Sequence, residues 1–295
     1  MKTTKFTLFF MIVASSAFAQ DYVFKVLANK GSNEVKSGTD WIPLKTGASL
    51  RSGDELKLSD NAYLGLVHNS GKPLEVKKAG SYKVEILESQ VKTGSGVLVK
   101  YTDFILSSNS TEAKKNKLSA TGAVDRGESY AIKVKLPENQ NSSIYNNVAV
   151  VSWDGNNAPG PYTITMRNMF DDEITKFETP ETSFQIDLND SKLSKEKAVI
   201  VEVRSKSDVK LVSKPYLIKK LSPADQAAIK KSLSEVATDL SEETALNKFI
   251  LAGFYENQNL FIDAITSFEQ AIKLAPDVTA YKEAYDDFLQ RHGMK

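Results

Sequence analysis

The amino-acid sequence predicts a multidomain fold in which two all-β domains precede a C-terminal α-helical region. Between Tyr22 and Ile218, short apolar runs alternate with a period of two residues, and Gly, Asn, Asp and Ser separate them. Such alternation is typical of strands with one buried face. After Leu221 the composition shifts to helix formers with apolar residues three and four positions apart, which is the spacing of one helix face.

The first residues are expected to be removed from the mature protein. Two lysines precede an apolar run at 6–13, and Ala-Phe-Ala at 17–19 is a small-x-small cleavage site. A membrane span needs about 20 apolar residues, so the run is too short for one. We therefore expect residues 1–19 to be a signal peptide, with a retained anchor helix as the alternative. No later stretch is apolar for long enough to predict a transmembrane span.

Cysteine content and net charge exclude several classes of function. The sequence has 0 Cys, so disulfides and a lipid-modified cysteine are excluded, and the domains must be stable through core packing. Removing residues 1–19 removes two lysines and no acid, which changes the formal net charge from +1 to −1. Nucleic-acid binding needs a concentrated basic surface, so no nucleic-acid partner is expected. These features predict an exported bacterial envelope protein, in the periplasm or at the cell surface.

The first β region is expected to contain short strands and no helix. Turn residues separate the expected strands, which lie at 22–28, 55–58, 62–68, 73–76 and 82–87. Three pairs of apolar residues have the two-residue spacing of one sheet face, namely Leu56 with Leu58, Leu64 with Leu66, and Val84 with Ile86.

One pattern in this region resembles a known family. The pattern is Trp41-x-Pro43-Leu44-x2-Gly47-x2-Leu50-x2-Gly53-Asp54-x-Leu56, followed by Ala62-x-Leu64-x-Leu66 and Gly71-x2-Leu74. It resembles the FecR-type domain over about residues 22–90, which implies an all-β envelope module known from sensors that signal between the two membranes. We expect a FecR-like domain over 20–106. A generic β-solenoid or sandwich has similar spacings and remains the alternative.

A polar stretch and a second β domain follow. Residues 107–118 lack periodicity and are expected to form a linker. Strands are expected at 130–136, 148–153, 162–166, 184–188 and 199–203, which predicts an antiparallel sandwich over 119–220. Val151-Ser152-Trp153 with Tyr162-Thr163-Ile164 resembles the central hairpin of fibronectin type III and immunoglobulin-like domains. The resemblance implies that Trp153 fills the core.

The helical region is expected to begin at Ser222, which precedes Pro223 as an N-cap residue does. The first helix should end near Asp239, and Ser241 should open the second. Residues 245–276 closely resemble one tetratricopeptide repeat, which places this unit within a helical domain at 221–295. The residues that carry the resemblance are Leu251, Ala252, Tyr255, Ala264, Phe268, Ala271 and Pro276. Flanking helices at 223–239 and 280–291 are expected to cover its two ends.

The resemblance also implies a binding face. In this family the first helix of the repeat supplies the inner surface, which here consists of Leu246, Phe249, Gly253 and Glu256. This face is expected to bind a partner helix or peptide, and packing on the second β domain or on another copy of the chain is the alternative.

Nothing in the sequence predicts catalysis, a metal or a cofactor. The two histidines, His68 and His292, lack nearby partners at metal-ligand spacing, and no nucleophile or phosphate-binding motif occurs. Asp171-Asp172-Glu173 is the one acidic cluster weighed for a hydrolase or calcium site. Aromatic side chains on a β surface can stack on sugars, and the two candidates are Trp41 and Trp153. Trp153 is expected in the core, however, and Trp41 belongs to the FecR-like pattern.

We therefore expect a non-enzymatic envelope adaptor that binds another protein, with a link to envelope signalling. A carbohydrate- or peptidoglycan-binding protein is the first alternative, and a glycan hydrolase is the second. The sequence leaves the oligomeric state open.

Overall fold

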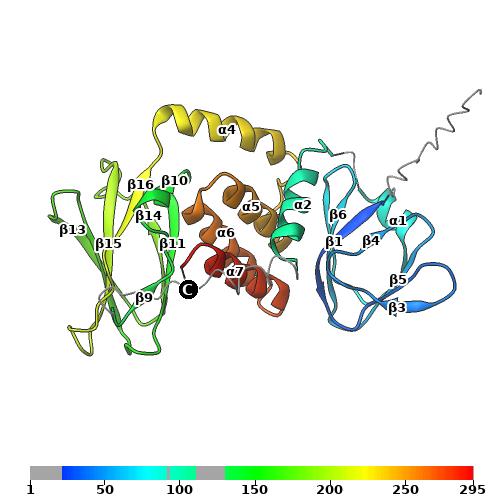
Figure 1. The fold of residues 1–295 in the computed structure, drawn as a ribbon, viewed down its shortest axis with the longest axis horizontal. Coiled ribbons are helices and arrows are strands. Elements are labelled where there is room, and N and C mark those ends of the chain that lie inside the picture. Colours follow the sequence, from blue (N-terminus) through cyan, green and yellow to red (C-terminus); the bar gives the residue numbers. More distant parts are fainter. Residues whose placement is uncertain (1–21, 92–93, 111–129, 295) are drawn as a thin grey trace, which may run out of the picture.

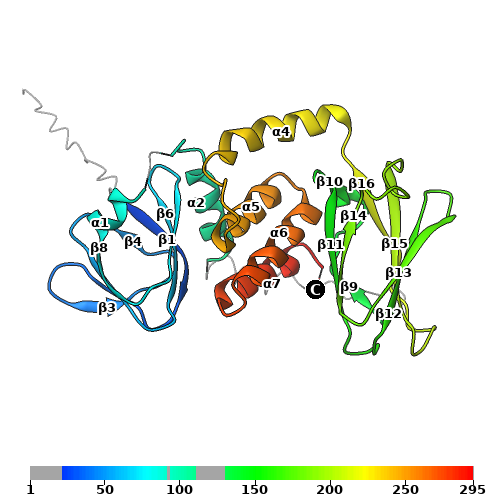
Figure 2. The same cartoon turned by 180° about the vertical axis from the view of Figure 1, so that it is seen from behind.

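The computed structural model describes residues 22–91, 94–110 and 130–294. An N-terminal β domain lies at one end of an elongated molecule, a β-sandwich lies at the other, and a layer of helices lies between them (Figure 1). The view from behind shows the same order (Figure 2). The expected combination of β-rich and helical parts is confirmed, although the helices that come last in the sequence lie in the middle of the molecule. The expected signal peptide falls outside the described residues.

The N-terminal β domain consists of two antiparallel sheets with one core between them. Their strand orders are β4-β1-β6-β7 and β3-β2-β5-β8. Both sheets contribute to the core, where Phe24, Leu56 and Leu64 are fully buried. The strands are β1 (Phe24–Lys30), β2 (Glu34–Lys36), β3 (Trp41–Pro43), β4 (Ser49–Leu50), β5 (Glu55–Leu58), β6 (Tyr63–His68), β7 (Pro73–Val76) and β8 (Gly80–Lys83).

Strand β6 is buried on both faces. Leu64 and Leu66 point into the core of their own domain, whereas Tyr63 and Val67 belong to the core that the domain shares with the helices. Since successive side chains of a strand point to opposite faces, the first sheet is packed on two sides. Its outer face is therefore an internal contact surface of the molecule.

The prediction of a strand at 82–87 is wrong for the second half of this range. β8 ends one residue before the short helix α1 (Val84–Ser89), in a region where no helix was expected. Val84 and Leu87 are buried, while Ile86 is 55% exposed. The buried residues are thus three apart, as on a helix, and the alternation of Val84 with Ile86 was a misleading signal.

The β-sandwich packs the sheet β10-β16-β15-β12-β13 against the sheet β14-β11-β9. Tyr162, Ile164 and Met166 alternate into its core, as expected. Trp153 is 3% exposed and meets Tyr162 edge to face at 5.2 Å between ring centroids, so the expected core position of this tryptophan is confirmed. The strands are β9 (Lys133–Val134), β10 (Ser143–Ile144), β11 (Val148–Asp154), β12 (Tyr162–Arg167), β13 (Glu173–Thr179), β14 (Ser183–Asp187), β15 (Ala198–Ser205) and β16 (Tyr216–Lys220).

The helical layer is built on an antiparallel pair, α5 (Ala245–Asn257) and α6 (Phe261–Leu274). Asn259 in the turn between them has a φ of 57°, a left-handed conformation that asparagine tolerates. Thr244, rather than the expected Ser241, caps α5 by accepting a hydrogen bond from the N–H of Asn247. Helix α7 (Thr279–Arg291) follows and buries three aromatic side chains, as expected: Tyr281, Tyr285 and Phe288.

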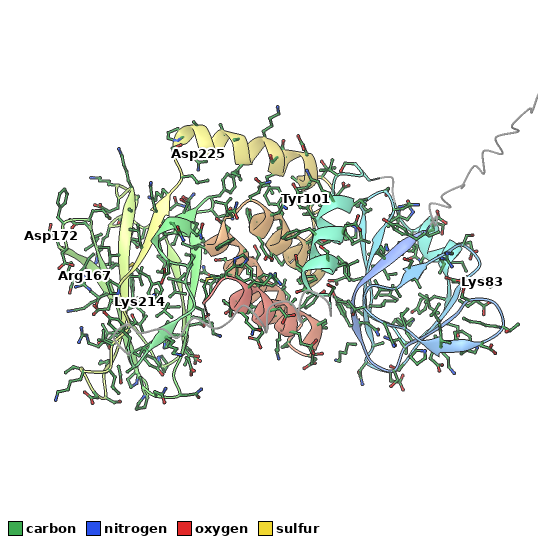
Figure 3. The ribbon with its side chains drawn as sticks, in the orientation of Figure 1. Lys83, Tyr101, Arg167, Asp172, Lys214 and Asp225 are labelled. Atoms are coloured by element: carbon green, nitrogen blue, oxygen red, sulfur yellow. The ribbon has the colours of Figure 1, made fainter. Side chains whose placement is uncertain are left out.

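The side of α5 away from α6 is covered by α2 (Val99–Ser108), a helix that the sequence did not predict (Figure 1). Tyr101 of α2, labelled in Figure 3, meets Phe254 of α5 edge to face, with ring centroids 5.2 Å apart. The expected linker at 107–118 begins inside this helix, and its residues from 111 onward are not described.

Helix α4 (Pro223–Ala237) was expected to cover that side of α5, but it crosses above the layer instead (Figure 1). It begins where predicted, with the Ser222 side chain accepting a hydrogen bond from the N–H of Asp225. Val236 is its only fully buried apolar residue, because the apolar stripe of α4 is narrow. Among the described residues, none of the helices combines the length and the apolar character that crossing a membrane requires.

Candidate interaction surfaces

The face of α5 that was predicted to bind a partner is covered by the chain itself. Leu246 is 0% exposed, Phe249 is 2% exposed and Glu256 is 7% exposed. Gly253, the fourth residue of the predicted face, is also buried. The covering elements are β6, β7, α2 and α7, so this face is an internal contact in the structure.

Two glycines allow the close approach of these elements. A Cβ atom on Gly253 would lie 2.5 Å from Cγ1 of Ile105 in α2, and a Cβ atom on Gly65 of β6 would lie 3.0 Å from Cδ1 of Leu246. Carbon atoms pack at about 3.5–4.0 Å. A side chain at Gly253 would therefore overlap Ile105, and one at Gly65 would require Leu246 to shift.

Glu256 is held by two side chains from the end of α7. The guanidinium of Arg291 donates to both carboxylate oxygens, at 2.7 and 2.8 Å, and Nε2 of His292 lies 2.9 Å from Oε1. Arg291 also donates to the carbonyl of Ser108 at the end of α2, at 3.2 Å. A buried charge is tolerated only with partners of this kind, so Glu256 ties α2, α5 and α7 together.

A second polar network joins the N-terminal domain to α5 and α7. Oε1 of Glu75 on β7 accepts hydrogen bonds from the Tyr63 hydroxyl, at 2.5 Å, and from the N–H of Leu246, at 2.9 Å. Lys77 pairs with Oε2 of the same carboxylate at 2.6 Å. The Tyr63 hydroxyl also lies 2.7 Å from the hydroxyl of Tyr281. One carboxylate thus connects three elements.

The protonation states of this network are fixed near neutral pH. Burial raises the pKa of Glu75, but hydrogen bonds from Lys77 and Tyr63 more than offset it, so the pKa lies below the ordinary value. Burial, with the neighbouring Tyr281 and Glu75, raises the pKa of Tyr63 far above its usual range. Glu75 is therefore a charged acceptor and Tyr63 a neutral donor.

The opposite face of the layer, on α6, meets the sandwich through polar side chains three residues apart. The contacts are Asp263 with the N–H groups of Tyr145 and Asn146 (2.8 and 2.9 Å), Thr266 with the N–H of Val150 (3.0 Å), and Glu269 with the hydroxyl of Ser152 (2.8 Å). Strand β9 pairs with β11 only at Trp153 and Asp154, so the first half of β11 has a free edge. Helix α6 covers that edge, which would otherwise be open to pairing.

Asp263 is the most buried carboxyl of this contact. Its side chain is 0% exposed, and burial raises its pKa to about 6 although the two N–H donors oppose the shift. The carboxyl is ionised at neutral pH and accepts both hydrogen bonds. Protonation below about pH 6 adds a hydroxyl where two N–H groups point.

A groove of about 730 Å³ opens beside the Glu75 network. Its volume lies within the range of ligand clefts, roughly 300–1,000 Å³. Strand β7 forms one side, and the connection from α4 to α5 forms another. Its charged lining residues are Lys72, Lys77, Lys78, Glu75, Asp239 and Glu242.

The lining of the groove includes a buried carboxylate held by several partners. Asp239 is 5% exposed and accepts hydrogen bonds from the N–H and the hydroxyl of Ser95, at 3.0 and 2.6 Å. The ammonium of Lys72 lies 3.7 Å from its other oxygen. Sequence reasoning missed this groove because distant segments build it. The one signal was Pro73 with Lys77 around a short strand, a composition typical of sheet edges.

The acidic cluster considered for catalysis or calcium lies at the β12–β13 hairpin, at the outer end of the sandwich, where Figure 3 labels Arg167 and Asp172. Each acidic side chain has its own partner. Asp171 forms an ion pair with Arg167 (3.3 Å), Asp172 accepts a hydrogen bond from Asn168 (3.0 Å), and Glu173 forms an ion pair with Lys176 (3.6 Å). Met169 and Phe170 beside them are 57% and 86% exposed. Within the described ranges, no three His, Asp or Glu side chains are grouped to hold a metal ion.

The remaining candidates have structural surroundings of different kinds. Trp153 is enclosed in the sandwich core, whereas Trp41 is 39% exposed beside Ile42 on the edge strand β3. Nδ1 of His68 accepts the N–H of Ser70 at 3.1 Å within a turn. The His292 ring packs on Phe261, with centroids 4.1 Å apart.

Neither a comparison with protein-family models nor a comparison with curated proteins gave a match for this chain.

Proposed function

We propose that the chain is a non-enzymatic adaptor exported to the bacterial envelope, where it binds a partner protein and holds two β domains at a fixed spacing. The observation that carries the proposal is the double-sided helical layer. One side of it is tied to the N-terminal domain through Glu75 and Tyr281, and the other side is tied to the sandwich through Asp263. Buried polar contacts on both sides favour a rigid arrangement over three loosely linked modules.

The sequence resemblances support the same role. In this proposal the domain at 20–106 is FecR-like, the domain at 119–220 is a fibronectin- or immunoglobulin-like sandwich, and 221–295 contains a tetratricopeptide-like repeat. All three are known as binding or spacing modules, and a fold alone assigns no activity. Since the inner face of the repeat is used within the chain, partner recognition is assigned to the surfaces that remain open, with the groove at β7 first among them.

Crosslinking in intact cells of the source bacterium tests the adaptor role. The mature chain, exported with its own leader, should capture a defined envelope protein in constant ratio, and the purified chain should then bind that protein directly. Capture of no protein, or turnover of a cell-wall substrate by the purified chain, would contradict the proposal. Truncation after Leu221 is a poor control because it removes the helices that cover both β domains.

A glycan-binding function is the second candidate, and one observation favours it. Trp41 is 39% exposed and Ile42 is 53% exposed on β3, so an aromatic ring is available for stacking on a sugar. Sedimentation of the mature chain with insoluble cell wall, lost in Trp41→Ala and kept in Phe170→Ala, would move the assignment to this candidate. If neither the mature chain nor its variants sediment with the cell wall, the glycan-binding function is excluded.

A further inference from the structure

The outer edge of β7 is free to pair with another strand. β7 is the last strand in the order β4-β1-β6-β7. The N–H of His68 donates to the carbonyl of Lys72 at 2.9 Å, which fixes the hydrogen-bonded positions of the hairpin. Because antiparallel ladders alternate, Leu74 and Val76 face β6, while Glu75 directs its backbone groups outward.

Four backbone groups point to the outside of the sheet by this alternation. They are the carbonyls of Pro73 and Glu75 and the N–H groups of Glu75 and Lys77. In the part of the chain that the structure describes, none of the four makes a hydrogen bond. An added strand pairs with donors and acceptors arranged in this way.

The groove stands directly over this edge, with a wall on each face of the sheet. Leu74 and Val91 pack on the core of the N-terminal domain, and both line the groove. On the opposite face, Glu75 bonds to Leu246, and Ser241 and other residues of the α4–α5 connection complete the lining. The space between the two walls therefore follows the strand edge.

Charge identifies the kind of segment that fits. Lys77 pairs with the largely buried Glu75, but its side chain is 61% exposed, and Lys78 beside it is exposed and has no ion pair among the described residues. The exposed end of the β7 edge is therefore positively charged, with Glu242 as the exposed acid of the lining. We infer that the β7 edge binds one extended, acidic segment of a partner protein, which joins the sheet as an additional strand. This inference rests on the proposed adaptor function and names the class of its partner.

A protected edge is the competing explanation. Proline and lysine at an edge strand discourage unspecific pairing between sheets. Pro73 removes a donor at one end only, and the outward groups of Glu75 and Lys77 remain. Walls on both faces hinder the approach of a whole sheet, whereas a single strand needs only these outward backbone groups, so protection and selective binding are compatible here.

Nuclear magnetic resonance of the complete mature chain tests the site with a defined probe. The probe is the capped peptide acetyl-TVEVDVT-amide, and the matched control is acetyl-TVKVKVT-amide. The amide signals of Glu75 and Lys77 should shift with the acidic peptide, and their hydrogen exchange should slow. The basic control should bind roughly twofold to fivefold more weakly, as expected for solvent-exposed charge pairs.

Two variants separate backbone pairing from side-chain contact. Lys77→Pro removes an outward donor without removing a bond to β6, and Lys77→Ala removes the same side chain but keeps the N–H. Binding of the acidic peptide should be about threefold to tenfold weaker in Lys77→Pro than in Lys77→Ala, as the loss of one hydrogen bond predicts. The Glu75–Tyr63 bond, monitored through the Tyr63 ring signals, reports whether both variants keep the fold.

Equal binding by the two variants, or no shift at β7 with either peptide, would overturn the inference. Self-association of the chain that Lys77→Pro abolishes would also overturn it, because the occupant would then be a second copy. The adaptor role is tested independently of strand addition.

If crosslinking in cells captures a protein although the peptide does not bind at β7, the adaptor role stands and strand addition is excluded. If the peptide binds and cells yield no partner, the site stands and the adaptor role falls.

Discussion

The two faces of the helical layer use different chemistry to hold a β domain. The face on the N-terminal side combines close backbone approach at two glycines with a network of buried side chains, in which Glu75 and Tyr63 meet Tyr281. The face on the sandwich side uses a polar row on α6 that bonds mainly to backbone N–H groups. The first contact therefore depends on particular side chains in both partners. The second depends on α6 but tolerates changes in the side chains of β11.

The largest effect is expected from Glu256→Ala, on the side of α5 that α2 and α7 cover. This change leaves the guanidinium of Arg291, whose side chain is 12% exposed, without its carboxylate partner. Loss of one member of a buried ion pair costs about 3–5 kcal/mol of unfolding free energy. Urea unfolding measures the loss. Glu243→Ala, which removes an 81% exposed partner of Lys248, is the control and should change stability by less than about 1 kcal/mol.

The sandwich side should show a pH dependence opposite in sign to that of the N-terminal side, where the lowered pKa of Glu75 favours folding at higher pH. The pKa of Asp263 is about 6 in the folded chain and 3.8 ordinarily, so the folded state binds its proton more tightly. This carboxyl therefore favours folding at low pH, and its contribution is lost as pH rises from about 4 to about 6. Relative to Asp263→Asn, which lacks the titration, the wild type should lose up to about 3 kcal/mol over this window. If the unfolding free energies of the two proteins change in parallel with pH, Asp263 is not the cause of the pH dependence.

Gly253→Val tests close approach on the N-terminal side. The new side chain would overlap Ile105, and overpacking of this kind costs about 1–3 kcal/mol. Adding Ile105→Ala should restore part of the loss, because it makes room on α2. Thermal unfolding of the two single variants and the double variant completes the cycle. Simple additivity of the two losses would show that the contact is not the cause.

The smallest effect is expected from Thr266→Val on the sandwich side. It removes the acceptor for the N–H of Val150 and keeps the shape of the side chain. One lost hydrogen bond to a buried donor predicts about 1–3 kcal/mol, near the lower end because the other α6 contacts remain. Faster hydrogen exchange at Val150, with unchanged exchange in β6, would assign the effect to α6. A uniform change across the chain would argue against a local bond.

Elements with a clear period could be predicted from the sequence, and contacts between distant segments could not. Tyr162, Ile164 and Met166 alternate strictly, and the strand that contains them is confirmed. Polar strands such as β13 (EITKFET) have no such contrast and were missed. Helix α2 was missed because it lies in a region that was expected to be all-β, where its apolar positions have no neighbouring helical pattern.

The apolar face of α5 was recognised, but its occupant was not. The apolar side chains of Leu246 and Phe249 predict that this face of α5 is buried. They do not identify which surface covers it. One signal was available: Gly65 stands inside an apolar strand, where an isolated glycine often marks close approach of another element. Nothing in the sequence links this glycine to Leu246, which approaches it from the opposite end of the chain.

The mismatch between chain order and spatial order affects how the protein can assemble. Both β domains are complete in sequence before residues 245–291, which form the helices that cover them. When the chain emerges from its N-terminus, during synthesis or passage through a pore, residues 245–291 come late. Until they emerge, they leave exposed the surfaces that they cover in the folded protein, namely Tyr63, Val67 and the edge of β11. A chaperone that binds these exposed surfaces would protect the chain until the helices form. A premature stop before α5 would produce two β domains with exposed apolar surfaces, which favours aggregation over a shorter functional protein.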